Sequence, residues 1–191
     1  MWVITANVNG IRSAARKGFF AWLQQQKADI VCVQEVVERD IDRLAAIAGP
    51  CVGFAPSGLN PVEAPDSGEI LQGNAIFTRI PLVDCSVRYY KGSEQNARTG
   101  VPQRIKQNFG LVVCDIDVRG AIYRFATLQF AWTPDGNPSD EQRVAFAALE
   151  PILNEFDSLV LCGDFNAPRG GEIFSLFSNR YVDHVPVEYT S

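Results

Sequence analysis

Several features of common protein classes are missing from this chain of 191 residues. The longest apolar runs, Ser158 to Cys162 and Phe109 to Cys114, are strand-length, far short of the roughly 20 residues that a membrane helix needs. The first residues show no basic segment, no long apolar segment and no small-residue cleavage site. We therefore expect no membrane span, a mature N-terminus and a cytoplasmic protein. Linkers, repeats and low-complexity tracts are absent too.

Cysteine is scarce, and its spacing excludes the usual cysteine frameworks. The five cysteines are odd in number, widely spaced, and mostly embedded in apolar strand-like runs, with no C-x-x-C pair among them. This pattern argues against a disulfide framework or a zinc site. We expect buried free thiols in a reducing compartment.

Charge is also low, and positive charge is outnumbered. With 47% hydrophobic and 20% charged residues, the chain can bury one sizeable core, which excludes disorder and a coiled coil. The net charge of −5 and the pI of about 4.9 lack the basic surplus typical of nucleic-acid-binding proteins. Carboxylates gathered around a metal would make the total acidic while leaving room for a local basic rim, so nucleic acid stays open as a partner.

The apolar pattern predicts a β-α-β opening followed by a β-rich middle. Strands are expected at Trp2 to Val8, Ile30 to Val33, Cys51 to Ala55, Asn74 to Thr78, Val83 to Tyr90, Phe109 to Asp117, Tyr123 to Phe130 and Ser158 to Cys162. Helical spacing is found at Gly18 to Gln26, with Phe19, Trp22 and Leu23 on one face, and at Glu38 to Ala48, and a short helix is expected at Glu172 to Phe177.

A further helix is predicted from a capping box formed by Ser139 and Gln142. It runs towards Phe156, and Pro151 should kink or restart it. Many central strands with helices around them indicate an α/β fold in which two mixed β-sheets pack face to face with helices outside, a four-layer α/β sandwich. The stretches 57–68 and 92–107 are predicted to be long loops, the kind that often touches ligand.

Three polar motifs stand where a predicted strand gives way to a loop. They are Asn7-Val8-Asn9-Gly10, Gln34-Glu35 and Gly163-Asp164-Phe165-Asn166. Each alone is more often a turn residue or a solvated helix start than a site. Together they offer carboxylate and amide oxygens for a hard cation and a base for water, at the strand ends where α/β folds bind ligands.

These motifs carry a family resemblance. The segment ANVNGIRSAARKGFFAWLQQQKADIVCVQE resembles the opening of exonuclease III and its relatives among the apurinic/apyrimidinic endonucleases. LCGDFNAPRG resembles the Asp-x-Asn motif of the endonuclease/exonuclease/phosphatase superfamily, and GNAIFTRIPL and ATLQFAWTPDG resemble its two central strands. The likeness runs from about Trp2 to Arg169. It implies a divalent-metal-dependent phosphodiester hydrolase, a DNA endonuclease or exonuclease of the kind used in DNA repair. We expect a monomer.

The resemblance also implies roles for individual residues. Glu35 would be the main metal ligand, and Asn7 would help to hold the metal or its water. Asp164 would orient and deprotonate the attacking water, while Asn166 would bond the phosphoryl oxygen as charge develops. Asn9 would contact phosphate or support the ligands. The implied metal is Mg²⁺ or Mn²⁺, which suits oxygen-only ligands.

The chain departs from the family pattern near its end. Members of the superfamily close with a Ser-Asp-His-like element on a final strand, and this chain ends too soon after Asn166 to hold it. We therefore expect residues 1–191 to form one domain that lacks its terminal strands. Asp183 and His184, the single histidine of the chain, are candidates for that element, but an ordinary loop position is the favoured interpretation.

Other polar residues are weaker candidates. Gln129 occupies a strand position where many relatives carry a His or Tyr that contacts phosphate; it can donate a hydrogen bond but cannot act as an acid. For Arg98, Arg104, Lys106 and Arg169, solvated loop charges and phosphate contacts stay equally open.

Two alternatives to a nuclease remain. One is a phosphatase or phosphodiesterase that acts on an inositol phosphate, a lipid headgroup or another small phosphoester, which the acidic pI favours. The other, of a different class, is an inactive fragment or a binding module that keeps the scaffold. Salt dependence would separate the first alternative from a nuclease, because release of counterions weakens binding to a phosphate backbone.

Overall fold

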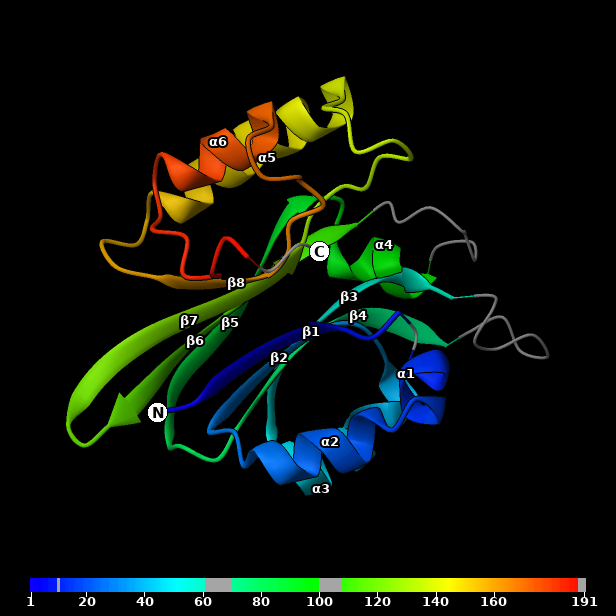
Figure 1. Cartoon of the computed structure of the whole chain (residues 1–191), viewed down its shortest axis with the longest axis vertical. Helices are drawn as coiled ribbons and strands as arrows, with labels where there is room; N and C mark the ends of the chain where they lie inside the picture. Colours follow the sequence, from blue (N-terminus) through cyan, green and yellow to red (C-terminus); the bar gives the residue numbers. More distant parts are fainter. Residues whose placement is uncertain (10, 61–69, 100–107, 189–191) are drawn as a thin grey trace.

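Two four-stranded sheets pack face to face, and helices cover the outer face of each (Figure 1). The computed structural model describes residues 1–9, 11–60, 70–99 and 108–188. The four layers confirm the predicted α/β sandwich. Within the described ranges, no helix combines the length and the apolar character needed to cross a membrane.

The first sheet is built from the N-terminal half of the chain. Its strand order is β1-β2-β4-β3, in which β1 and β2 are parallel and the other neighbours are antiparallel. The strands are β1 (Val3–Asn7), β2 (Ile30–Val37), β3 (Cys51–Leu59) and β4 (Leu71–Thr78), and the helical segments of this half are α1 (Arg12–Arg16), α2 (Phe19–Gln26), the 3-10 turn η1 (Glu38–Asp40) and α3 (Ile41–Ala48). This sheet is therefore mixed, as predicted.

The second sheet follows in sequence and is mixed in the same way. Its order is β5-β6-β7-β8, with the parallel pair β7 and β8 at one edge. The strands are β5 (Leu82–Lys91), β6 (Phe109–Val118), β7 (Ala121–Gln129) and β8 (Val160–Asp164), and the helices of this half are α4 (Glu94–Thr99), α5 (Asp140–Leu153) and α6 (Glu172–Ser178). In Figure 1, α5 and α6 lie over the outer face of this sheet, and α2 and α3 lie under the first sheet.

Alternation along the strands divides the core into three apolar layers. In β2, Ile30 and Cys32 face the second sheet, while Val31 and Val33 face the helices of the first half. All four side chains have no exposed surface. Strands buried on both faces read as continuous apolar runs, which is why β2 was easy to identify from the sequence.

The capping box at the start of α5 is confirmed. The Ser139 hydroxyl accepts a hydrogen bond from the Gln142 main-chain N–H, and the Gln142 side chain accepts one from the Ser139 N–H, both at 3.2 Å. The predicted extension to Phe156 is wrong, because α5 ends at Leu153. Pro151 lies in the last turn, where its missing N–H removes a hydrogen bond close to the point at which the helix ends.

Two other sequence predictions need correction. Trp22 is 45% exposed, whereas Leu23 is buried and Phe19 is partly buried against the core, as predicted, and Phe20 is the further buried residue of α2. The Arg43 guanidinium lies 3.6 Å from the centre of the Phe20 ring, so α3 covers that face rather than the one bearing Trp22. The expected loop over 92–107 contains the helix α4, and residues 100–107 lie outside the described ranges.

All five cysteines are free thiols, as predicted. Cys32 and Cys114 are fully buried and the other three are partly buried. Burial raises the pKa of the Cys51 thiol to about 11. Cys85 and Cys114 occupy paired positions on β5 and β6, and their sulfur atoms are 2.7 Å apart.

Gly163 determines the position of Asp164, the last residue of β8. Gly163 has φ 151°, and a Cβ atom at this position would lie 2.3 Å from the carbonyl oxygen of Leu128 on β7. Any side chain here would therefore push β8 away from β7. Because Gly163 directly precedes Asp164, the close approach of the two strands also sets the position of that carboxylate.

We expect Gly163→Ala to destabilise the fold strongly, by about 3 kcal/mol or more, because a side chain collides with a backbone oxygen that cannot move aside. The check is urea unfolding followed by circular dichroism. Gly120→Ala is the matched control: Gly120 has φ 86° but open space around it, so only the conformational penalty of roughly 1–2 kcal/mol applies. Equal losses in the two variants would contradict the proposed close approach of β7 and β8.

Candidate active site

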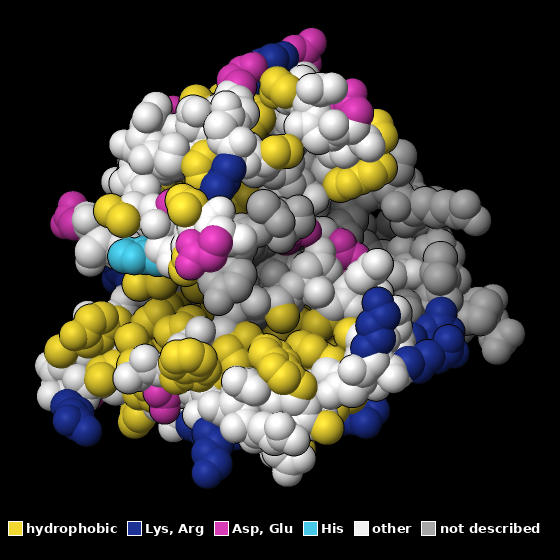
Figure 2. Space-filling view, in the orientation of Figure 1, with side chains coloured by type: hydrophobic (Ala, Val, Ile, Leu, Met, Phe, Trp, Pro, Cys, Tyr) yellow, Lys and Arg dark blue, Asp and Glu magenta, His cyan; other side chains and the backbone are white. Residues whose placement is uncertain are grey.

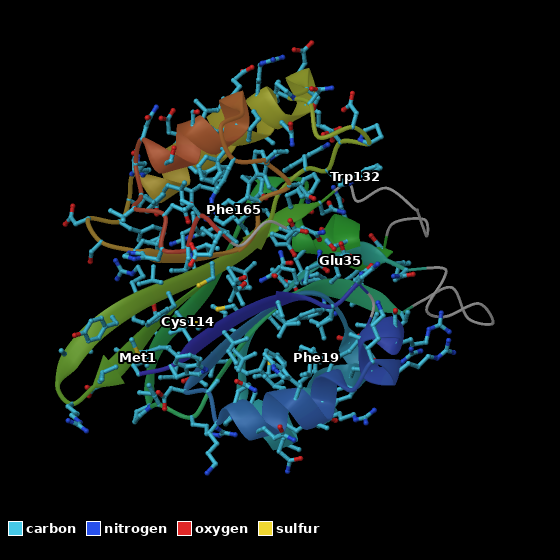
Figure 3. All side chains as sticks on the ribbon, in the orientation of Figure 1. Met1, Phe19, Glu35, Cys114, Trp132 and Phe165 are labelled. Atoms are coloured by element: carbon cyan, nitrogen blue, oxygen red, sulfur yellow. The ribbon has the colours of Figure 1, made fainter. Side chains whose placement is uncertain are left out.

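Polar side chains from both sheets meet at the ends of β1 and β8. The Asn7 side-chain nitrogen donates hydrogen bonds to Glu35 Oε1 at 3.2 Å and to Asp164 Oδ2 at 2.7 Å. Asn7 is the last residue of β1, and Asp164 is the last residue of β8. One carboxamide thus connects two carboxylates that are far apart in sequence and belong to different sheets. Figure 3 shows the end of the sheets at which Glu35 lies, with Trp132 and Phe165 on the side of the second sheet.

Glu35 lies within β2 rather than beyond its end. The strand continues to Val37, so the expectation that Gln34-Glu35 follows the strand is wrong. The pairing with β4 shifts between Val33, opposite Ala75, and Val36, opposite Gly73, which leaves one extra residue on β2. Such a bulge re-aims a side chain, and Glu35 has the left-handed φ of 60° that a non-glycine residue adopts at a cost.

Two glutamines also donate to the Glu35 carboxylate. The Gln129 side-chain nitrogen, at the end of β7, donates to Oε1, and the Gln72 nitrogen, on β4, donates to Oε2 at 3.1 Å. Both glutamines are nearly buried, with exposed fractions of 6% and 7%. Strands of both sheets therefore orient this carboxylate.

Hydrogen bonds hold the loop after Asp164 in place. The Asn166 main-chain N–H donates to Asp164 Oδ1 at 3.1 Å, and the Asn166 side-chain nitrogen donates to the Phe130 carbonyl at 2.8 Å. Asn166 has a left-handed φ of 47°. The buried Gln142 side chain of α5 donates to the Asn166 carbonyl at 3.0 Å. This loop is consequently tied to the segment after β7 and to α5.

Asn9 acts on the site through its backbone. Its main-chain N–H donates to Asn7 Oδ1 at 2.9 Å, which leaves the Asn7 nitrogen facing the two carboxylates. Asn9 is exposed and has φ 45°. Of the six non-glycine residues with positive φ in the described ranges, three (Asn9, Glu35 and Asn166) belong to the predicted motifs. Unusual backbone conformations gather at functional sites.

Buried polar groups support the site from within. Gln34 is 1% exposed, and its side-chain nitrogen donates to Thr127 Oγ1 at 2.8 Å and to Thr5 Oγ1 at 3.2 Å, so it links β1 and β2 to β7. The Tyr90 hydroxyl donates to the Gln129 carbonyl at 2.9 Å. Burial raises the pKa of Tyr90 well above its usual value, so the phenol stays neutral and keeps this proton.

Arg169 and Asp183 contact each other near the C-terminal end of the described chain. Arg169 Nε donates to Asp183 Oδ2 at 2.9 Å, and its other nitrogens donate to the carbonyls of Val185 and Pro186. The backbone N–H of Val185, together with Arg169, lowers the pKa of Asp183 below its usual value. In this structure Arg169 therefore holds the segment around residues 183–186.

His184 and Arg98 make no hydrogen bond or ion pair with the cluster within the described ranges. His184 is exposed, and none of the hydrogen bonds found across the described ranges joins it to Glu35 or Asp164. Arg98 pairs with Glu94 on its own helix at 2.8 Å and with Glu38 at 3.6 Å. Arg104, Lys106 and Gly10 lie outside the described residues.

The donor set fits a magnesium-like ion. Across the ranges that the structure describes, no group of three His, Cys, Asp or Glu side chains is arranged to bind a metal. Glu35 and Asp164 offer two carboxylates next to amide groups. Mg²⁺ is usually held by one or two carboxylates, with water and substrate phosphate completing its shell, whereas zinc sites need three or four protein ligands. Ligation by Asn7 would require its amide to rotate, since its nitrogen now faces the carboxylates.

The sequence pointed to Gln34 as part of the Gln34-Glu35 motif, but not to Gln72 or Tyr90. Gln72 was detectable in principle, because it is a polar residue within a strand whose eight positions are all buried. A buried glutamine needs hydrogen-bond partners, and here the partner is the site.

Comparisons with known proteins agree with the fold. A functionally unknown conserved protein from Enterococcus faecalis has 15% identity and a TM-score of 0.66, with 96% of this chain and 73% of that chain covered. TDP2 from D. rerio, in complex with single-strand DNA product, has 16% identity and a TM-score of 0.60, covering 93% of this chain and 63% of that one. A mannosyl-6-phosphatase from Bacteroides thetaiotaomicron has 14% identity and a TM-score of 0.59, covering 93% and 70%.

At such low identities these structures establish the fold alone. A search of curated proteins gives no match. A family model, described as Endonuclease/Exonuclease/phosphatase family, matches residues 4–188, which is nearly the whole chain. The matched range includes Asn7, Glu35 and Asp164. The chain therefore belongs to the endonuclease/exonuclease/phosphatase family.

Proposed function

We propose that this protein is a divalent-metal-dependent phosphodiester hydrolase acting on DNA. The observation that carries the proposal is the contact of Asn7 with both Glu35 and Asp164, which brings two carboxylates from separate sheets to one point. Two carboxylates a few ångströms apart repel each other by roughly a few kcal/mol at a partly exposed site. A bound cation would remove that repulsion.

The proposed roles follow from the contacts of each side chain. Glu35, held by Gln72 of the first sheet and Gln129 of the second, is the anchor for the cation, with Asn7 beside it. When bound, Mg²⁺ or Mn²⁺ would polarise a phosphoryl oxygen and offset the charge that develops on it. Asp164 has one carboxylate oxygen fixed by the Asn166 N–H, and its other oxygen can accept a proton from water once Asn7 turns toward the cation.

Asn166 is proposed to donate to the phosphoryl oxygen in the transition state. Its side-chain nitrogen now donates to the Phe130 carbonyl, so this role requires the amide to exchange one acceptor for another. Asn9 lies next to Asn7 at the exposed edge of the site and would contact phosphate. Gln129 would support Glu35 and lend no acid function, since a carboxamide does not titrate.

A polynucleotide substrate is favoured by two observations. The first is the resemblance of the opening segment, with Asn7 and Asn9, to exonuclease III and its relatives. The second is the likeness in fold to TDP2, whose structure holds single-strand DNA product. A small phosphoester is the second candidate, favoured by the pI of about 4.9 and by the likeness to a mannosyl-6-phosphatase. With DNA as the substrate, Arg104 would contact the phosphate backbone, and Arg169 would do so by exchanging its contact with Asp183 for a phosphate oxygen. Asp183 and His184 would stay outside the chemistry.

We predict that Glu35→Gln and Asp164→Asn each lower metal-dependent hydrolysis of DNA by about 10²-fold or more, because each removes an electrostatic or acid–base contribution. Rates measured with Mg²⁺ at saturation, on protein freed of metal beforehand, check this. The melting temperature should change little, since the amide replacements keep the size of both side chains and the loss of charge repulsion offsets the hydrogen bond that each amide nitrogen cannot accept.

Glu155→Gln is the matched control for that prediction. Glu155 is exposed and lies 4.0 Å from Arg88, and exposed pairs of this kind contribute little to stability. It should leave the rate unchanged. Turnover near the parent rate in either site variant would remove that residue from the proposed chemistry.

We further predict that hydrolysis of single-stranded DNA slows by at least about tenfold between 50 and 200 mM salt, because bound phosphates release counterions. Hydrolysis of p-nitrophenyl phosphate and its phosphodiester analogue, measured in parallel, should be slower and nearly independent of salt. Preference for the small esters would favour the second candidate. The absence of turnover on every substrate would instead favour a binding module.

A further inference from the structure

Gln72 makes two contacts with a single acidic residue. It lies on β4 opposite Val37, beside the bulge in β2. Its side-chain nitrogen donates to the Glu35 main-chain carbonyl at 3.2 Å and to Glu35 Oε2 at 3.1 Å. One buried carboxamide therefore restrains both the backbone and the carboxylate of Glu35.

The bulge explains why such a contact is needed. An extra residue in one strand interrupts the ladder, so its carbonyl needs a partner other than the facing strand. The Gln72 nitrogen donates to the Glu35 carbonyl at the bulge, and a hydrogen bond to a partly buried carbonyl stabilises the local backbone. The same contact supports the left-handed φ of 60° at Glu35.

The orientation of Gln72 is itself fixed. The Asn60 side-chain nitrogen donates to Gln72 Oε1 at 2.7 Å, and the Ser57 hydroxyl donates to the Gln72 carbonyl at 2.9 Å. Because the amide oxygen is occupied by Asn60, the amide nitrogen must face Glu35. A chain of directed contacts thus runs from the end of β3 through β4 to the carboxylate on β2.

We propose that Gln72, oriented by Asn60, is a positioning residue that sets the affinity of the Glu35 site for a divalent cation. The inference rests on the proposed function, in which Glu35 holds that cation. An uncharged donor suits this role, because it fixes the direction of the carboxylate without adding a positive charge that would repel the cation. Removal of groups that orient metal ligands typically costs about 10 to 100-fold in metal affinity.

The test is direct Mn²⁺ binding, measured by calorimetry and by electron paramagnetic resonance of the free ion, with no substrate present. Gln72→Met keeps the length of the side chain and removes both the donor and the acceptor. We expect it to weaken Mn²⁺ binding by about 10 to 100-fold while the protein stays folded. Asn60→Ala leaves Gln72 in place but frees its amide, so a smaller loss in the same direction is expected.

The two changes should also be coupled. Because Asn60 acts through Gln72, the double variant should bind Mn²⁺ no more weakly than Gln72→Met alone, whereas independent effects would add. Gln25→Met, at an exposed position on α2, is the matched control and should bind Mn²⁺ as the parent does.

Each outcome decides the matter. Parent-like Mn²⁺ affinity in Gln72→Met overturns the inference and leaves the proposed function standing. If the parent protein itself does not bind Mn²⁺, the proposed function fails and this inference fails with it. Should Gln72→Met not fold, Asn60→Ala decides: weaker binding by the folded variant supports the proposal, and unchanged binding refutes it.

Discussion

The arrangement of this molecule depends on one amide that lies between two carboxylates. Asn7 ends β1 of the first sheet and donates to Glu35 of the same sheet and to Asp164 of the other. This contact is possible only because the edge strands β1 and β8 end side by side. Each of these strands is parallel to its neighbour, β1 to β2 and β8 to β7, so the carboxyl ends of four strands meet at one edge of the sandwich. Figure 2 shows acidic side chains recessed between the upper and lower parts of the molecule on the face that is drawn.

The packing of the two sheets maintains this alignment. An apolar layer between them, which includes Ile30, Ile76 and Phe125, fixes their distance. Gln34 adds a directional link by donating to threonines on β1 and β7, and a buried polar contact of this kind favours one register over others. A slide of one sheet against the other would break the Gln34 contacts and separate Asn7 from Asp164. The same packing that stabilises the core therefore also fixes the geometry of the site.

Much of this could be predicted from the sequence, for physical reasons that differ between elements. Strands buried on both faces, such as β2, appear as apolar runs, and the capping box at Ser139 is a local contact between near neighbours. The joint appearance of Asn7, Glu35 and Asp164 at predicted strand ends indicated one site, and the structure brings them together, although Glu35 lies within β2. The bulge at Glu35 could not be foreseen, because it depends on which residues of β4 lie opposite. For the same reason the partner of Gln72 could not be predicted: a buried glutamine shows that a contact exists, not which residue makes it.

The buried position predicted for Trp22 was wrong because helical spacing alone does not say which of two apolar faces a neighbouring helix covers.

The most direct test of the proposed active site is the position of Mn²⁺ in a crystal of the parent protein, located by its anomalous scattering. We predict one strong peak at bonding distance from a Glu35 carboxylate oxygen, with Asp164 beside it and the Asn7 amide turned so that its oxygen faces the ion. The hydrogen bond from the Gln72 side chain to the Glu35 main-chain carbonyl should persist. A peak elsewhere in the molecule, or no peak at Glu35 at millimolar Mn²⁺, would contradict the claim that these strand ends form a cation-dependent active site.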